Sequence, residues 1–449
     1  MTSDPVEPPA SGACRASDAA LSPAAYREEL VRHLRAFGAS AREESVPLTE
    51  ASGRVLAAPL AAPEPSPRFA NSQMDGYAIS ELRGGRFVVG PEIPAGTDPQ
   101  QLPGKSSPQT ERSLPLAWPV MTGSRLPEGT HAVLPVERAE PPEFLPEGAV
   151  ITVPSLESGA FVREAGSDVA EGAELAPAGT VLTPPLIALA AQLGWERLPV
   201  RARPRLLVVT GGEEIVETGA RPGPAQVRDA NAVLLSALAG GQGAEVVASV
   251  RTGDDPAALA RVLGEAAATH TPDLILTSGG ISHGRYEVVR QLLLGSPGFW
   301  VGSVSQQPGG PQCRGSYEGL PVIGLPGNPV STWVSFRMLL APALAEAFGA
   351  VPPPRPVMAR MAAAAEGIDG RTQFRRGRLE PGEGGGWESS ESEFPALRPP
   401  ALTATAPRAV LLGGPGSHLL AQGALAEALI EIPPGARLAP GDPVVVHPL

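Results

Sequence analysis

Four short apolar runs between residues 205 and 325 constrain the fold of this sequence more than any other feature. RLLVVT, EVVASV, DLILT and PVIGL are apolar at nearly every position, as strands buried on both faces of a sheet must be. The stretches between them have helical patterns: NAVLLSALAGG, DPAALARVLGEAAATH and YEVVRQLLL. Strands and helices that alternate in this way predict a parallel sheet covered by helices, over about residues 201–349.

The rest of the chain is rich in proline and glycine. Residues 1–20 are acidic and proline-rich, which is typical of a disordered tail, and an amphipathic helix capped by Ser22 follows. The region 45–200 holds short strand candidates (GRFVVG, HAVLPVE, GAVITVP, FVREAG) and closes with a helix from Thr183. After a VPPPRP linker, the last hundred residues suggest a small β domain. We therefore predict a multidomain protein of α/β plus β class.

Charge and composition exclude several partners. The net charge is −12 and there is no Lys/Arg-rich run, so a nucleic acid partner is not expected. No apolar stretch is long enough to span a bilayer, and the N-terminus lacks a signal-peptide pattern, so we expect a cytoplasmic protein without a membrane partner. Two cysteines, Cys14 and Cys313, are too few for a metal cluster or a disulfide framework.

The third apolar run ends in Ser278-Gly279-Gly280, and polar residues including Glu287 follow. Ligands of open α/β sheets bind beyond the carboxyl ends of the strands, where glycines let the backbone approach a ligand closely. The helix start that follows suits a phosphate, and Glu287 could hold Mg²⁺ against it. The alternative is a plain turn with a solvated glutamate.

Two other strand ends repeat this arrangement. VIGLPGNPVS gives a tight turn at 326–329 before a helix, where Ser331 either caps the helix or binds an anion. VVTGG is followed by Glu213 and Glu214, and Asp229 and Asn231 precede a helix that either could cap. Three acidic strand ends in one domain are consistent with a phosphate site bridged by Mg²⁺.

Five motifs occur in one order along the chain: NSQMDGYAI, PVMTGSRLPEGTHAVLPVE, VREAGSDVAEG, TSGGIS and GLPGNPVS. Together they resemble the molybdopterin molybdenumtransferases, the family of MoeA and the gephyrin E domain. The resemblance covers nearly everything after residue 20. It implies a β-rich linker domain with a helix (21–60 and 153–200), an inserted β domain (61–152), a molybdopterin-binding α/β domain (201–349) and a C-terminal β domain (350–449).

The same resemblance implies a function in molybdenum cofactor biosynthesis. Family members are homodimers whose site combines the α/β domain of one chain with the linker and inserted segments of the other. They take adenylylated molybdopterin and molybdate, insert molybdenum and release AMP in a step that needs Mg²⁺. A molybdopterin adenylyltransferase is a further expected partner. The alternative is a weakened homologue that binds or scaffolds molybdopterin.

Site residues follow from the motif positions. The catalytic acids implied by the resemblance are Asp75, Asp168, Glu214 (with Glu213 as the alternative), Asp229 and Glu287, of which Asp229 and Glu287 would hold the metal. The implied substrate-binding residues are Thr122, Gly123, Thr210, Gly211, Ser278, Gly279, Gly280, Ser282, Pro326, Gly327, Asn328 and Pro329. The implied molybdate or oxyanion residues are Ser331, Arg371, Arg375 and Ser417.

One departure from the family weakens the expectation of full activity. Members usually carry Lys-Pro-Gly-Lys-Pro where this chain has Gln307-Pro308-Gly309-Gly310-Pro311. Neutral Gln307 and Gly310 cannot replace two ammonium groups beside a phosphate or molybdate. Arg314 and His283 are candidates to supply part of the missing charge.

Overall fold

The computed structural model describes residues 20–102, 114–281, 287–382 and 406–449. The chain divides into two compact units, each described below by itself. The first unit comprises residues 1–44, 53–55 and 200–449, and the second comprises 45–52 and 56–199. The four-domain division stays a prediction, and the expected tail lies almost wholly outside the described residues.

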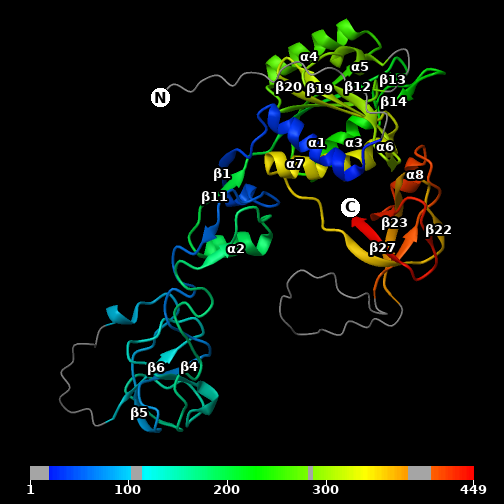
Figure 1. The fold of residues 1–449 in the computed structure, drawn as a ribbon. Coiled ribbons are helices and arrows are strands. Elements are labelled where there is room, and N and C mark those ends of the chain that lie inside the picture. Colours follow the sequence, from blue (N-terminus) through cyan, green and yellow to red (C-terminus); the bar gives the residue numbers. More distant parts are fainter. Residues whose placement is uncertain (1–19, 103–113, 282–286, 383–405) are drawn as a thin grey trace. The chain divides into compact units, whose positions relative to one another are not determined.

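The first unit is built on a six-stranded sheet (Figure 1). All four predicted strands are present and run parallel, in the order β15 (Glu245–Thr252), β12 (Arg205–Gly211), β16 (Leu274–Ser278) and β20 (Leu320–Leu325). Beyond β20 the sheet continues with two antiparallel strands, β19 (Pro311–Tyr317) and β17 (Trp300–Ser303). The sheet is therefore mixed at one edge, and the polar sequence PQCRGSY of β19 lacks the apolar pattern of the four predicted strands.

Helices cover both faces of this sheet. Leu206 and Val208 of β12 pack on one face, and Leu207 and Val209 pack on the other, as the alternation of a strand requires. The first face carries α1 (Pro23–Ala36), α3 (Asn231–Gly241), α6 (Pro329–Ser335) and α7 (Ala341–Phe348), and the second carries α4 (Pro256–His270) and α5 (Val288–Leu293).

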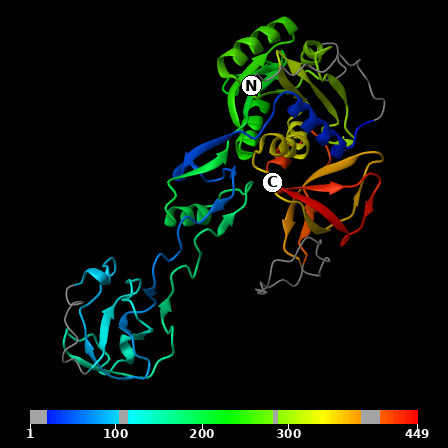
Figure 2. The ribbon, with the colours of Figure 1, turned by 60° about the vertical axis from the view of Figure 1, so that its left-hand side comes forward.

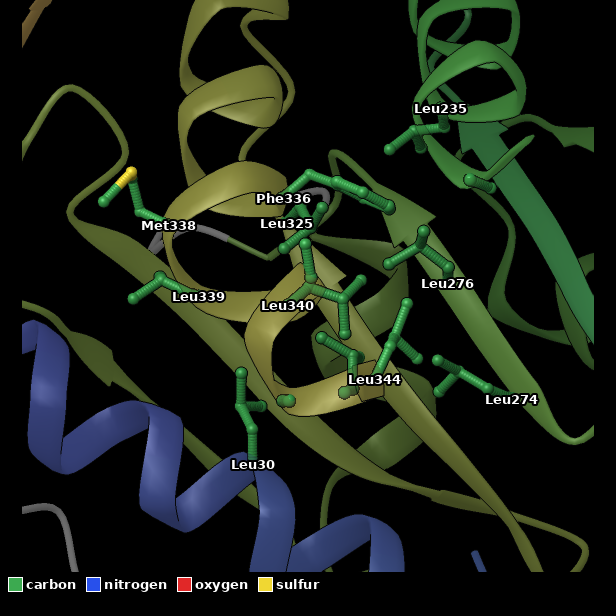
Figure 3. Packing of buried hydrophobic residues seen from close by; sticks show 14 of the residues in the cluster. Leu30, Leu235, Leu274, Leu276, Leu325, Phe336, Met338, Leu339, Leu340 and Leu344 are labelled. Carbon is green, nitrogen blue, oxygen red and sulfur yellow. The ribbon is translucent and has the colours of Figure 1, made fainter. Parts of the chain in front are cut away.

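The helix that follows β20 is interrupted. The helix predicted after the turn at 326–329 is present, but a π-helical turn (Phe336–Leu340) separates α6 from α7. Ala341 donates its N–H to Phe336 O, five residues back, and Pro342 has no N–H to continue the α-helical ladder. Figure 3 shows this turn packed beside α1, with Leu339, Leu340 and Leu344 near Leu30 in the core.

The C-terminal strands form a closed β-barrel (Figure 2). Its strands pair in a ring, which runs β23 (Thr372–Glu380), β24 (Arg408–Leu411), β21 (Val357–Met361), β27 (Pro443–Pro448), β25 (Ala428–Ile432) and back to β23. The short β18 (Gln306–Gln307) joins the ring by pairing in parallel with β23. Shorter elements of this unit are β13 (Ile215–Val216), β14 (Val227–Arg228), β22 (Ala365–Glu366), α8 (Leu420–Gly423) and β26 (Arg437–Leu438).

The second unit contains a five-stranded sheet in the order β7 (Ala132–Pro135), β4 (Gly76–Ile79), β6 (Leu116–Val120), β5 (Gly85–Val89) and β8 (Val150–Val153). Its remaining elements are β2 (Leu60–Ala61), β3 (Asn71–Ser72), β9 (Val162–Arg163), β10 (Glu174–Ala176) and α2 (Pro184–Gln192), the helix predicted from Thr183, which is its N-cap residue. The strands β1 (Glu43–Pro47) and β11 (Arg197–Arg201) pair where the chain passes from one unit to the other.

Across the ranges that the structure describes, none of the helices combines the length and the apolar character that a membrane span needs.

Candidate functional site

A cavity of about 690 Å³ opens at the carboxyl ends of the parallel strands. The chain leaves β12 for β15 on one side and then crosses to β16 on the other, so the strand order reverses between β12 and β16, where ligands bind in such sheets. The predicted residues that line this cavity are Thr210, Gly211, Glu214, Asp229, Ser278, Gly279, Gly280, Glu287, Pro326, Gly327, Asn328, Pro329 and Ser331. Ser282 and His283 lie outside the described residues.

The two glycines after β16 are required by backbone geometry. Gly279 and Gly280 have φ of 92° and 68°, which only glycine adopts without strain. The Gly279 N–H donates to Leu325 O at 3.0 Å, and a Cβ on Gly327 would lie 3.2 Å from the Gly279 Cα. Two loops thus meet backbone to backbone at the mouth of the cavity.

Ser278 helps to hold these loops together. Its side chain is buried, and its hydroxyl lies 3.1 Å from Pro326 O and 3.2 Å from the Thr332 hydroxyl. Thr332 in turn donates to Pro326 O at 2.5 Å. The Ser278 hydroxyl therefore holds the turn at 326–329. Because the hydroxyl is engaged in this way, Ser278 would contact a ligand through its backbone groups.

Asp229 connects the end of β12 to the start of α3. Its Oδ2 accepts a hydrogen bond from the Thr210 hydroxyl at 2.5 Å, and its Oδ1 accepts one from Ala232 N–H at 3.0 Å. The N-cap residue of α3 is Ala230, and of the two predicted capping residues Asp229, just before it, is the one whose side chain accepts an N–H of the first turn. Asn231 donates instead to Gly327 O at 2.6 Å.

Two amide oxygens in the cavity wall have no partner among the described residues. The Oδ1 atoms of Asn231 and Asn328 are buried and accept no hydrogen bond from this part of the chain, and both side chains line the cavity. Buried acceptors without a donor are costly, so a ligand with N–H or O–H groups would be stabilised here.

Four carboxylates line the same cavity: Glu214, Asp229, Asp254 and Glu287. The Glu213 Oε1 lies 3.5 Å from Asp254 N–H, and of the two glutamates Glu214 is the one that lines the cavity. No three Asp, Glu, His or Cys side chains of the described ranges are grouped closely enough to enclose a metal ion. Hard oxygen donors that leave room for water and phosphate oxygens nevertheless suit Mg²⁺.

Sequence reasoning missed Asp254. It follows the carboxyl end of β15 in the run Thr252-Gly253-Asp254-Asp255, where Asp255 caps α4 by accepting Ala257 N–H at 3.0 Å. The signal that identified Glu213 and Glu214, an acid shortly after a glycine at the end of an apolar strand pattern, would have found Asp254 as well.

A second cavity, of about 510 Å³, shares Pro311 and Ser331 with the first. Its lining includes Arg371 and Ser417, two of the predicted oxyanion residues, together with His418. It also includes Gln307 and Gly310, the two positions that carry lysine in the family. The departure predicted to matter therefore lies in the cavity that holds the oxyanion candidates.

This second cavity is assembled by strand pairing and by two arginines. Gln306 of β18 is in register with Thr372 of β23, which brings the segment 307–311 beside Arg371. Across the cavity, the loop 413–416 is held by its carbonyls: Arg375 donates to Gly413 O at 3.2 Å, and Arg376 donates to Gly416 O at 3.0 Å and to Gly414 O.

Two arginines suggested for oxyanion or charge compensation are engaged elsewhere. Arg375 does not line the second cavity, and burial lowers the pKa of its guanidinium. Arg314 pairs with Glu29 at 3.1 Å and donates to Gly298 O at 3.0 Å, so it braces α1 against β19 rather than replacing a lysine.

In the second unit, Asp75 is held by Thr122. Its Oδ1 accepts hydrogen bonds from the Thr122 N–H at 2.7 Å and hydroxyl at 2.9 Å, and these bonds hold the pKa of the carboxyl below its usual value. Gly123 continues the turn with φ of 83°. A Cβ on the neighbouring Gly76 would lie 2.0 Å from Leu134 O, so a glycine is required there for strand pairing. Asp75 itself is exposed and remains available to contact a ligand.

Asp168 is also exposed in the second unit. Its N–H donates to Ser66 O at 3.0 Å, and its Oδ2 lies 3.4 Å from the Ser66 hydroxyl, which also accepts from Gln192 at 2.7 Å. A turn of this kind explains Asp168 structurally and leaves its proposed catalytic role as a prediction.

Two family models match the chain. Residues 21–194 match the MoeA N-terminal region (domain I and II), and residues 207–346 match a probable molybdopterin binding domain. A crystal structure of a MoeA protein from Pyrococcus horikoshii superposes with a TM-score of 0.70 at 25% identity, over 96% of this chain and 99% of that one.

Curated relatives carry a consistent name. Molybdopterin molybdenumtransferase 2 of Mycobacterium tuberculosis is 37% identical over 352 residues, which are 76% of this chain and 84% of that protein. Molybdopterin molybdenumtransferase 1 of the same organism is 30% identical over 91% of this chain and 95% of its own length. The protein of that name in Haemophilus influenzae is 31% identical over 68% and 73%.

Proposed function

The chain belongs to the molybdopterin molybdenumtransferase family, and we propose that it inserts molybdenum from molybdate into adenylylated molybdopterin, with Mg²⁺-dependent release of AMP. The observation that carries this proposal is the pair of cavities that share Pro311 and Ser331. One suits a nucleotide-linked phosphate and the other a tetrahedral oxyanion, and the reaction must bring the two together.

The first cavity would bind the phosphoanhydride of the substrate. Backbone N–H groups after β16 and in the turn at 326–329 are the natural donors to phosphate oxygens. The unpartnered amide oxygens of Asn231 and Asn328 would accept hydrogen bonds from the amino groups of the pterin or the adenine. These N–H groups and amide oxygens would orient the anhydride, and the buried residues in the wall of the first cavity would exclude water.

Charge in the first cavity requires a cation. Four carboxylates and one cationic residue among the described lining, Arg228, surround this cavity, so its net negative charge would repel an anionic substrate. Asp229 and Glu287 would hold Mg²⁺, with Glu214 and Asp254 near it, and the ion would offset the charge that develops on the departing phosphate. Asp229 is already fixed in place by Thr210 and Ala232.

The second cavity would hold molybdate. Arg371 offers a guanidinium fork, and Ser331 and Ser417 offer hydroxyl donors. Since Ser331 lines both cavities, an oxyanion beside it would lie next to the substrate in the first.

We propose a homodimer as the working form. Asp75, Thr122 and Asp168 belong to the unit that lacks the two cavities, and the family's site takes such residues from a second copy. The full chain should sediment as a dimer at micromolar concentration, and a monomer would contradict this part of the proposal. Cytoplasmic action and supply of substrate by an adenylyltransferase stay predictions from the sequence.

One observation favours an alternative function. Neutral Gln307 and Gly310 line the oxyanion cavity, so a homologue that binds or carries molybdopterin without efficient insertion is the second candidate. The test is AMP release from adenylylated molybdopterin on addition of molybdate and Mg²⁺. Release that depends on both additions supports the transferase, whereas tight substrate binding without release supports the carrier.

A further inference from the structure

Positive charge in the second cavity comes from few side chains. Of the described residues that line it, only Arg371 and His418 can carry a positive charge. A tetrahedral dianion such as molybdate bears two negative charges, and the family's two lysine positions are neutral here. With Arg371 alone, one charge of the ligand would lack a partner.

The neighbouring arginines cannot supply that charge. Arg375 and Arg376 donate to the carbonyls of Gly413, Gly414 and Gly416. These bonds fix the loop that carries Ser417 and His418, and a guanidinium turned toward a ligand would release the loop. The two arginines therefore build the cavity wall instead of binding its contents.

His418 is placed by the loop itself. A Cβ on Gly416 would lie 2.8 Å from the His418 Cε1, so the absence of a side chain there lets the imidazole lie against the loop backbone. His418 O accepts Leu420 N–H at 3.0 Å, at the start of α8. His418 is solvent-exposed and lines the cavity beside Ser417, so a proton can reach it.

The charged groups around His418 couple protonation of its imidazole to binding of the anion. Arg371, with Arg375 and Arg376 behind the loop, opposes a further positive charge on the ring. The segment 303–311 and helix α8, which also adjoin the loop, contribute no titratable side chain among the described residues. A dianion bound in this cavity would attract both Arg371 and a protonated His418, and this attraction opposes the repulsion between the two positive charges.

We propose that His418 is an oxyanion-binding residue that acts as an imidazolium, so that one proton is taken up with each tetrahedral dianion bound in the second cavity. The proposal rests on the proposed function, since it takes this cavity as the molybdate site. It gives His418 the role that an ammonium group at 307 or 310 has in the family's usual sequence, and it makes molybdate capture dependent on pH.

The test is calorimetric titration of the full chain with sodium molybdate, at about pH 6 and about pH 8, where histidine side chains ordinarily change charge. Molybdate remains a dianion over this range. We expect the affinity to fall about tenfold at the higher pH, equivalent to one favourable charge contact of about 1.4 kcal/mol. Titrations in buffers of different ionisation enthalpy should show proton uptake with binding.

Two variants test separately whether His418 binds the anion and whether the second cavity is the molybdate site. His418→Gln should bind molybdate weakly at both pH values and without proton uptake, whereas Arg371→Gln should lose binding at both. His270→Gln, at the far end of α4, is the matched control and should retain the wild-type pH dependence.

Four outcomes would overturn the proposal. Wild-type binding that is independent of pH but lost in Arg371→Gln would leave molybdate in the cavity and remove His418 from its binding. A pH dependence that survives in His418→Gln would do the same. Binding that persists in Arg371→Gln, or no binding by the wild type, would also reject this cavity as the molybdate site of the proposed function.

Discussion

The Asp229 carboxylate accepts a 2.5 Å hydrogen bond from the Thr210 hydroxyl, and this contact ties the end of β12 to the first turn of α3. The other carboxylate oxygen caps that helix through Ala232 N–H. Asp229 thus has a structural task and, as a buried acid in the cavity wall, a proposed catalytic one. The two tasks can be separated because only the second needs the negative charge.

Asp229→Asn should retain the fold and lose activity. The asparagine Oδ1 can still accept Ala232 N–H, and asparagine is among the best N-cap residues, so the melting temperature should change by only a few degrees. AMP release should fall at least about a hundredfold, because charge stabilisation at the phosphate is lost. Asp255→Asn, which caps α4 in the same way outside the cavity lining, should keep activity. Equal activity in both variants would contradict the role of Asp229.

Adjacent Glu213 and Glu214 offer a second matched comparison. Glu214 lines the first cavity, while Glu213 faces Asp254 N–H. Glu214→Gln should therefore lower the rate of AMP release at least about tenfold, and Glu213→Gln should lower it little. Steady-state kinetics at saturating Mg²⁺ would measure both, and the reverse order would assign the site acid to Glu213.

The sequence predicted the sheet and the first cavity because both depend on local patterns. β12, β15, β16 and β20 are apolar at nearly every position, and parallel strands place their carboxyl ends at one edge. β19 could not be predicted, because its outer half pairs with β17 at an edge of the sheet and its polar residues carry no strand signal. The π turn at 336–340 was hidden inside one continuous apolar pattern.

The second cavity depends on contacts that a sequence does not display. The pairing of β18 with β23 involves two residues on each strand, from segments about 65 positions apart. Nothing in RTQFRRGRLEP (371–381) distinguishes Arg375, whose guanidinium holds a loop carbonyl, from Arg371, which lines the cavity. His418 gave no signal of its own, since a histidine after a glycine-rich turn is ordinary surface sequence.

Asp75 should contribute to activity through its negative charge and should contribute little to the stability of the fold. An asparagine there can still accept the Thr122 N–H, so Asp75→Asn should fold normally and melt near the wild-type temperature. Because hydrogen bonds from Thr122 lower the pKa of Asp75, the carboxylate stays ionised through the neutral range, and the activity of the variant should be reduced at every pH where the wild type works. Unchanged turnover in this variant would remove Asp75 from the site.

Buried His33 should make the protein acid-sensitive. Its Nε2 lies 2.8 Å from Gly315 O, and burial lowers its pKa from 6.5 to about 4. As pH falls below about 6.5 the unfolded chain takes up this proton while the folded chain resists until about pH 4, so the free energy of unfolding should fall by about 3 kcal/mol across that window.

The measurement is denaturant unfolding at several pH values. His33→Gln has no proton to gain at this position and should lose this part of the pH dependence, although its stability at neutral pH will be lower. His270→Gln retains the buried imidazole and should lose stability in acid as the wild type does. An equal slope in all three proteins would show that other groups cause the acid sensitivity.

Gly310→Lys should restore charge to the oxyanion cavity. Gly310 is outside the left-handed region, and a Cβ there would lie 3.4 Å from Ser303 Oγ, an ordinary contact. Gly309, with φ of 88° and a Cβ contact of 2.4 Å, offers no such space. A lysine at 310 would place an ammonium beside the oxyanion, so the molybdate concentration that gives half-maximal AMP release should fall about tenfold. Gly240→Lys adds the same charge on the exposed end of α3 and should leave the requirement unchanged. If both lysine variants behave alike, the neutral residues of the cavity do not limit molybdate capture.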